Sequence, residues 1–313
     1  MIQLLLHQLI RYAIVTALLA SAACLRAQSP SRPHILGVAH IAVFAHDYEK
    51  SRSFYGGFLG FEEPYSLKNK DSTFFKINDH QYLELFPERE PGSDRLNHIS
   101  LETDDIEALR LYLASKGVKV PDHAQPARIG NLSFNIIDPA GHQVEMVQYM
   151  PAGKTAAAYG KYMSDTRISS HMTHVGLIVT KLDPEYKFYT EILGFKETWR
   201  GSSSGTVLSW INLKVPDGDD YVEFMLAKNA PDPAHRGSAH HLCLQVPDVE
   251  SSLETLKTRP YFKTYNHPIE VHLGINRKRQ ANLFDPDGTR IELMEPHTID
   301  GKATPSSTAP PPE

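Results

Sequence analysis

The chain repeats itself, and this repetition constrains its fold more than any other feature of the sequence. The stretch VAHIAVFAHDYEKSRSFYGGFLGFEE begins at Val38, and the stretch MTHVGLIVTKLDPEYKFYTEILGFKE begins at Met172. Each stretch has β-prone residues, a turn, apolar residues at helical spacing, and then LGF before another strand. The length of 313 residues leaves room for two ordinary domains, and the two copies predict that the domains are alike.

A second kind of unit follows each copy. HISLETDDIEALRLYLASKG begins at His98 and HLCLQVPDVESSLETLKTR begins at His241, and both predict a strand that leads into an amphipathic helix. Each unit closes with two strands joined by an Asp-Pro-x-Gly turn, in IIDPAGHQVEMVQY and LFDPDGTRIELMEP. The sequence therefore predicts four βαβββ modules in two pairs. We expect an α+β fold of cupped mixed sheets with helices on the outer face.

The repeat also sets the expected boundaries. We expect an N-terminal domain at 36–150, a linker at 151–170, a C-terminal domain at 171–296 and a disordered tail at 297–313. The tail is assigned from its Pro- and Ser-rich composition, which offers no apolar surface to bury.

The first 30 residues are interpreted as a targeting segment. Arg11 precedes an apolar run of 13 residues, which is short for a membrane span and suits a signal peptide. Cleavage near Ala27 predicts export to the periplasm or secretion, and the mature form would then have no stable membrane span. Lipid attachment at Cys24 and an uncleaved membrane anchor are the alternatives.

Composition narrows the class of partner. Apolar residues make up 41% and charged residues 22% of the chain, which is typical of a folded soluble protein. The formal net charge is -5, and no basic run is interleaved with aromatic residues, so we expect no nucleic-acid partner. A small-molecule substrate is expected, and assembly as a homodimer is left open.

Strand alternation places acids and imidazoles on the face opposite the helices. In QYLELF, Leu83 and Leu85 share one face, so Glu84 points to the other. The same reasoning selects two sets of four residues: His40, Glu84, His98 and Glu145, then His174, Glu223, His241 and Glu292. Both sets follow the order His, Glu, His, Glu. Their offsets of 134, 139, 143 and 147 (174−40, 223−84, 241−98 and 292−145) drift as loop insertions would produce.

This donor set predicts a metal site in each half. A carboxylate on the hidden face of a sheet is costly unless it is paired or metal-bound. A single such residue is ordinarily a strand residue that faces solvent, but eight at matched positions argue against that interpretation. Two imidazoles and two carboxylates fit one divalent cation per functioning site, and Fe, Zn, Ni, Mn and Co are all chemically permissible.

At these residues the sequence resembles the vicinal oxygen chelate superfamily of glyoxalases, extradiol dioxygenases and bleomycin resistance proteins. The resemblance spans nearly all of 36–296 and rests on motifs such as SFYGGFLGF, HISLETDDI and DPDGTRIEL. It implies paired modules around a metal that chelates two neighbouring substrate oxygens. In glyoxalase-like members the last glutamate of each set also acts as a base, which implies catalytic roles for Glu145 and Glu292.

The reaction is left between three interpretations. The favoured one is an exported metal-dependent lyase or isomerase acting on a small substrate with vicinal oxygens. The first alternative is an Fe(II) extradiol ring-cleaving dioxygenase that uses His174, His241 and Glu292. Asn282 departs from that pattern, because such enzymes carry a tyrosine there, and Glu223 departs as well. The second alternative is a non-catalytic binding protein of the resistance type, in which we would expect degraded metal sets.

Four further residues are expected to contact the substrate. Tyr82 and Trp210 share the strand parity of the inward residues, and Asn135 and Asn282 are placed to orient a substrate oxygen. His240 adjoins His241, and the match of HHLCL with NHISL assigns the metal to His241.

Overall fold

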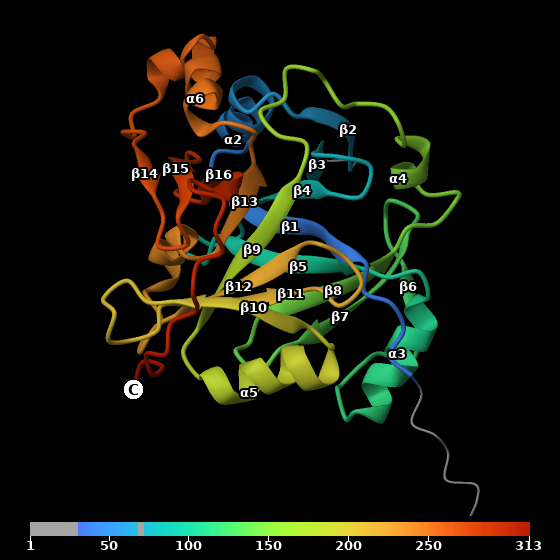
Figure 1. Ribbon diagram of the computed structural model, residues 1–313. Helices are drawn as coiled ribbons and strands as arrows, with labels where there is room; N and C mark the ends of the chain where they lie inside the picture. Colours follow the sequence, from blue (N-terminus) through green and yellow to red (C-terminus); the bar gives the residue numbers. More distant parts are fainter. Residues whose placement is uncertain (1–30, 68–71) are drawn as a thin grey trace, which may run out of the picture. The chain divides into compact units, whose positions relative to one another are not determined.

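Two mixed eight-stranded sheets of the same topology make up the fold (Figure 1). This computed structural model describes residues 31–67 and 72–313. In spatial order, the first sheet contains β2 (Glu62–Ser66), β3 (Thr73–Lys76), β4 (Tyr82–Pro87), β1 (Gly37–Ala45), β5 (Leu96–Glu102), β8 (Gln143–Gln148), β7 (Leu132–Ile137) and β6 (Gln125–Pro126). The second contains β10 (Lys196–Gly201), β11 (Trp210–Lys214), β12 (Tyr221–Leu226), β9 (Met172–Val179), β13 (His241–Gln245), β16 (Arg290–Thr298), β15 (Lys278–Phe284) and β14 (Val271–Leu273). The expected α+β fold of paired modules in tandem is confirmed.

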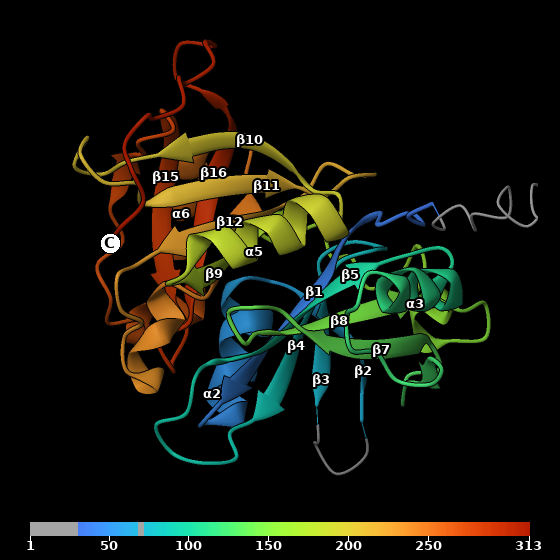
Figure 2. The ribbon, with the colours of Figure 1, turned by 90° about the horizontal axis from the view of Figure 1, so that it is seen from below.

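Short helices accompany each sheet (Figure 2). They are α2 (Tyr48–Arg52) with the π-helical turn η1 (Ser53–Phe58), α3 (Ile106–Ser115), α4 (Lys154–Ala157), α5 (Leu182–Lys187) with the π-helical turn η3 (Phe188–Ile192), the 3-10 turn η4 (Pro233–Ser238), α6 (Val249–Lys257) and the 3-10 turn η5 (Pro260–Thr264). Asp105 and Asp248 cap α3 and α6, since each side chain accepts a hydrogen bond from a first-turn amide. The sequence fixes these helix starts through side chains that satisfy otherwise unpaired N–H groups.

The two modules of one half pair with each other. β1 runs antiparallel to β5 in the first sheet, and β9 runs antiparallel to β13 in the second. The four central strands are therefore β4, β1, β5 and β8 in the first sheet, and β12, β9, β13 and β16 in the second. These eight strands carry the eight predicted metal ligands, so the topology collects each set at the middle of its sheet.

The apolar face of each sheet packs under the helices. Ile41, Leu83 and Ile99 on the first sheet are each at most 1% exposed, and so are Val175 and Phe224 on the second. Along each strand, these side chains alternate with side chains that point to the opposite face of the sheet. That opposite face is therefore free to line a cup. Burying one such side chain stabilises the fold by about 1.5–3 kcal/mol.

The Asp-Pro-x-Gly turns have the geometry that their sequence predicts. Gly141 and Gly288 have φ of 95° and 85°, a region that residues with a Cβ rarely occupy. The amide of each glycine donates to the carbonyl of the first turn residue, Asp138 or Asp285, at 3.0 and 3.1 Å. A tight turn therefore joins β7 to β8 and β15 to β16.

Each of these turns docks on the first helix of the other half. The Tyr55 hydroxyl donates to Oδ2 of Asp285 at 2.8 Å, and the Tyr189 hydroxyl donates to Oδ2 of Asp138 at 3.3 Å. Both tyrosines and both aspartates are buried. Because the contact is reciprocal, each half completes a buried polar group of the other, and residues Arg32–Glu313 form a single compact unit.

The segment expected to be a linker covers part of the first sheet. Its helix α4 places Thr155, which is 3% exposed, against the cavity of the first half. The buried Lys76 ammonium donates to the carbonyls of Ala158 and Lys161 at 2.5 and 2.9 Å. This segment therefore packs as part of the N-terminal half.

The C-terminal tail makes contacts where its composition predicts disorder. The Ser307 amide donates to the Arg200 carbonyl at 2.9 Å, and the Leu208 amide donates to the Pro310 carbonyl at 2.8 Å. The Thr304 hydroxyl donates to the Asn276 carbonyl at 2.6 Å. The composition of the tail reports its apolar content only. It does not predict these contacts, because they are hydrogen bonds to the second half.

The predicted signal peptide, with Cys24 and Ala27, lies outside the described residues. Within residues 31–67 and 72–313, no helix combines the length and the hydropathy that a bilayer crossing requires.

Candidate metal sites

The first predicted set converges in the cup of the first sheet. His40 Nε2 lies 2.8 Å from His98 Nε2, 3.6 Å from Glu84 Oε2 and 3.4 Å from Glu145 Oε2. All four side chains line one cavity of about 260 Å³. Ligand atoms of His40, Glu84 and His98 lie within 4.8 Å of one another, so these three form the tighter group.

Glu145 is held slightly apart by hydroxyl groups. The Ser100 hydroxyl donates to Glu145 Oε2 at 2.9 Å, and Ser133 adds a second hydrogen bond. Burial raises the pKa of Glu145, and the two serine hydrogen bonds oppose that shift. A carboxylate with a raised pKa beside three other donors has the properties of a base.

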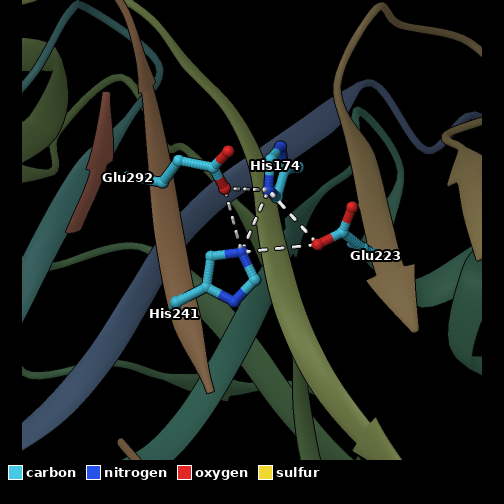
Figure 3. A group of neighbouring side chains, drawn as sticks. All are labelled: His174, Glu223, His241 and Glu292. Carbon is cyan, nitrogen blue, oxygen red and sulfur yellow. Dashed lines mark hydrogen bonds and ion pairs between the residues drawn. The ribbon is translucent and has the colours of Figure 1, made fainter. Parts of the chain in front are cut away.

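The second set converges more symmetrically in the cup of the second sheet (Figure 3). The two imidazole Nε2 atoms of His174 and His241 are 3.1 Å apart. Glu292 Oε2 lies 3.5 Å from each of them, while Glu223 Oε2 lies 3.9 Å from His174 and 3.6 Å from His241. Figure 3 shows both carboxylates and both Nε2 atoms directed at one point.

The separations fit a shared cation. Two ligands at about 2.1 Å from a metal ion lie about 3.0 Å apart at an octahedral edge and about 3.4 Å apart in a tetrahedron. The two Nε2 atoms lie 2.8 Å apart in the first cup and 3.1 Å apart in the second, and the distances from Nε2 to carboxylate oxygen run from 3.4 to 3.9 Å. These separations span the expected values. The residues present therefore fit a divalent ion in each cup.

Hydrogen bonds orient the imidazoles for this role. His241 Nδ1 lies 2.7 Å from the Ala239 carbonyl and 2.9 Å from a guanidinium nitrogen of Arg290, and these contacts hold the outer edge of the ring. His98 Nδ1 is 3.0 Å from Asn97 Oδ1, which holds that ring in the same way. The Nε2 atoms of both imidazoles are thus directed into the cups.

The protonation of the two cups differs. Burial, with the charge of Glu145 adding to it, raises the pKa of Glu84 to about 8, and burial lowers the pKa of His98 to about 4. In the second cup, burial and the charge of Glu292 raise the pKa of Glu223 to about 6. Burial also favours protonated Glu292, but hydrogen bonds from the two histidines outweigh it and hold that pKa well below its usual value. Without a cation, the first cup keeps a proton near neutral pH.

Three of the four predicted substrate residues lie at the cavities. Tyr82 lines the first cavity, and Trp210 and Asn282 line the second, which has a volume of about 220 Å³. Asn135 does not line the first cavity: it is exposed and accepts a hydrogen bond from Gln143 Nε2 at 3.1 Å. Asn135 pairs with Glu145 between β7 and β8, just as Asn282 pairs with Glu292 between β15 and β16, but only Asn282 lines its cavity.

Several cavity residues escaped the sequence prediction. Arg128 and Tyr149 line the first cavity, and Trp199, His272 and Arg290 line the second. Arg128 lies in the loop after β6, which offers no periodic signal. Strand parity could have found Arg290, which is two residues before Glu292 on β16 and faces the same side.

Known proteins resemble the chain in sequence and in fold. The model of the Glyoxalase/Bleomycin resistance protein/Dioxygenase superfamily matches residues 37–146 and 171–293. The uncharacterized protein YaeR of Escherichia coli (strain K12) is 34% identical over 93 residues, which cover 26% of this chain and 72% of that protein. The Mn(II)-bound glyoxalase from Novosphingobium aromaticivorans is 17% identical with a TM-score of 0.64, covering 90% of this chain and 89% of that one.

A second structural relative supports the same fold. The 2,3-dioxygenase LapB from Pseudomonas sp. KL28 is 18% identical with a TM-score of 0.62, covering 90% of this chain and 97% of that one. The family match covers well over half of the chain and includes both repeats. The protein therefore belongs to the Glyoxalase/Bleomycin resistance protein/Dioxygenase superfamily.

Proposed function

We propose that the protein is an exported, divalent-metal-dependent enzyme that transfers a proton on a small substrate with two neighbouring oxygens. The observation that carries this proposal is the convergence of two complete quartets of two histidines and two glutamates. The ligands would be His40, Glu84, His98 and Glu145 in one cup, and His174, Glu223, His241 and Glu292 in the other. Because both sets of metal ligands are complete, the proposal disfavours a binding protein that has lost its metal.

The first cup is the better candidate for the chemistry. A bound divalent cation would supply Lewis acidity, which increases the acidity of a C–H bond next to a coordinated oxygen. Glu145 would accept that proton on a carboxylate oxygen, because it stands apart from the three tighter ligands. Ser100 would hold the carboxylate in place through its 2.9 Å hydrogen bond. The protonated Glu145 would return the proton to the neighbouring carbon, and the substrate hydroxyl proton would pass to the former carbonyl oxygen, which completes an isomerisation.

Aromatic side chains would exclude water from this cup. Tyr65, Phe74, Tyr82 and Phe86 line the cavity beside the quartet. A low-dielectric wall strengthens the interaction between a carboxylate and a developing charge. Tyr82 is therefore proposed to contact the substrate, as are Trp210 and Asn282 in the second cup.

Metal content measured on the purified mature protein tests the proposal. Wild type is expected to carry one equivalent of a divalent metal in each cup, and Glu84→Ala and Glu292→Ala are each expected to lose the equivalent of their own cup. Glu145→Gln should keep the metal and lose at least 100-fold in C–H exchange of hydroxyacetone in D₂O, followed by NMR. Metal-free wild type, or unchanged exchange in Glu145→Gln, would refute it.

One observation keeps a second candidate in view. His272 on β14 lines the second cavity together with Glu223 and Glu292, so a titratable group faces that cup. If an Fe(II) ion bound by His174, His241 and Glu292 catalysed ring cleavage, His272 would be the titratable group available beside it. Oxygen uptake by the iron-loaded protein with catechol, absent from a His174→Ala variant, would favour this candidate over proton transfer.

A further inference from the structure

A third cluster of metal-ligand side chains lies outside both cups, where the two halves meet. Asp138 and His142 belong to the turn between β7 and β8, and Glu185 belongs to α5 of the other half. One ligand atom of each lies within 4.8 Å of the others. Asp138 is 3% exposed and Glu185 is 0% exposed, so both carboxyl groups are cut off from water.

The hydrogen bonds of this cluster bring two carboxyl groups face to face. His142 Nδ1 lies 2.8 Å from Asp138 Oδ2, and Glu185 Oε2 accepts from the Ala140 amide at 2.8 Å. No N–H or O–H donor among the described residues reaches the buried Glu185 Oε1, and its carboxyl group can hydrogen-bond to Asp138 only by sharing a proton with it. Burying the two carboxylates without a proton or a cation between them is therefore unfavourable.

A second imidazole lies next to the same cluster. The ring of His240 packs edge-on against the ring of His142, with 5.2 Å between their centroids. His240 is 3% exposed, and its Nε2 lies 3.5 Å from Asp94 Oδ2. Within residues 31–67 and 72–313, its Nδ1 has no hydrogen-bond partner. With the ring proton directed at Asp94, this Nδ1 keeps its lone pair.

The matching position in the other half provides an internal control. There, Ser51 replaces Glu185 and Thr289 replaces His142, at the same offsets of 134 and 147 residues that relate the cups (185−51 and 289−142). Ser51 donates to Asp287 Oδ2 at 3.1 Å, and the Thr289 amide donates to Asp285 Oδ1 at 2.8 Å. Docking a turn on a helix therefore needs neither the extra acid nor the imidazole.

The cluster must hold a positive charge or a proton. Burial, followed by the charge of Asp138, raises the pKa of Glu185 to about 9. Two buried carboxyl groups this close cannot both ionise unless a cation offsets their charge. A divalent cation can take the place of that proton, and its ligands would be two carboxylates and one imidazole, a set that zinc accepts.

We propose that Asp138, His142 and Glu185 bind a divalent cation of the zinc type between the two halves. The ring of His240 packs edge-on against the ring of His142, one of these ligands. The site is separate from both cups and does not depend on the proposed enzyme activity. Its role is structural, since its ligands come from both halves and the ion would tie the β7–β8 turn to α5.

Zinc titration in a background without cup binding tests this site. The quadruple variant His40→Ala/His98→Ala/His174→Ala/His241→Ala removes both imidazoles from each cup, and calorimetry with Zn²⁺ should still find one equivalent. Adding Glu185→Ser or His142→Thr should weaken that binding at least tenfold. Both replacements copy the residue at the matching position, so the turn and helix keep a compatible partner. Ser51→Ala is the control and should leave the binding unchanged.

Two results would overturn the proposal. One is the absence of stoichiometric binding in the quadruple variant, and the other is binding that Glu185→Ser does not weaken. Either would mean that the carboxyl pair holds a proton instead. Where a variant fails to fold, anomalous scattering from zinc-soaked wild-type crystals decides, since a peak is expected between the turn and α5. Neither result bears on the metal content of the cups.

Discussion

Ser100 and Cys243 occupy the same position in the two halves and treat the neighbouring glutamate differently. Ser100 donates a hydrogen bond to Glu145, whereas the buried Cys243 sits beside Glu292 on the paired strand. A thiol is a weak donor, so Glu292 depends on its histidines instead. Because of this one difference, Glu145 of the first cup is held by a residue that is not one of the four predicted metal ligands.

Removing that donor should change the basicity of Glu145. Ser100→Ala deletes a hydrogen bond that favours the ionised form, so the pKa of Glu145 should rise further. The ¹³C NMR titration of labelled glutamate in the metal-free protein measures this shift. Ser100→Thr keeps the hydroxyl and should titrate like wild type. An unchanged pKa in Ser100→Ala would show that the hydroxyl does not set the charge of Glu145.

The two cups should bind metal with different pH dependence. In the first cup, a cation must displace the proton of Glu84, whose pKa is about 8. In the second cup, it must displace the proton of Glu223, whose pKa is about 6. Mn²⁺ affinity of the first cup should therefore fall about tenfold per pH unit below pH 8, and that of the second cup only below pH 6. Titrations of Glu292→Ala and Glu84→Ala isolate the first and second cup respectively. Identical profiles for the two variants would contradict these assignments.

At the scale of elements, the C-terminal tail joins two parts of the second half. It bonds to Asn276, between β14 and β15, and to Arg200 and Leu208, which flank the connection from β10 to β11. Because β10 and β14 are the two edges of that sheet, the tail spans its open side. A stop codon after Lys302 removes these three hydrogen bonds.

We expect this truncation to lower the free energy of unfolding by about 1–4 kcal/mol, at about 1 kcal/mol for each hydrogen bond. Hydrogen exchange should accelerate at the amide of Leu208, which donates to Pro310. Amides of the first sheet serve as the control and should keep their protection. Full protection of Leu208 in the truncated protein would show that the tail contact does not persist in solution.

The sequence predicts the elements better than their long-range partners. The repeat and strand parity predicted the modules and directed residues such as His40 and Glu223 to one face, because both signals are local. Parity gives the face of a strand but not the outline of the cavity above it, and Asn135 therefore pairs with Glu145 without lining the first cavity. The meeting of Glu185 with Asp138 could not be predicted, because it depends on how two halves dock and not on any spacing.

At the scale of the whole molecule, buried acids set the response to pH. Folding raises the pKa of Glu84 to about 8 and of Glu185 to about 9, from a usual value of 4.5. Each group favours the folded state while it is protonated. Its contribution to the free energy of unfolding is therefore fully present below pH 4.5 and is lost as the pH rises towards 8 or 9.

The metal-free protein should therefore be less stable at pH 9 than at pH 6, by a few kcal/mol. Urea unfolding in the presence of EDTA measures the difference. Glu84→Gln removes one of the titrating groups and should flatten the curve, and saturating Zn²⁺ should do the same by replacing the protons. Stability that increases from pH 6 to pH 9 without metal would contradict the raised pKa values.

The reciprocal docking of turn on helix has a consequence for how the chain can be divided. Tyr55 reaches Asp285 and Tyr189 reaches Asp138, so the mating surfaces do not rely on the peptide that connects the halves. Two fragments that are produced separately, one for each half of the chain, should therefore reassemble when they are mixed. A fragment pairing with its own kind would place Ser51 or Glu185 against the wrong turn. Complementation between unlike fragments should thus prevail over self-association.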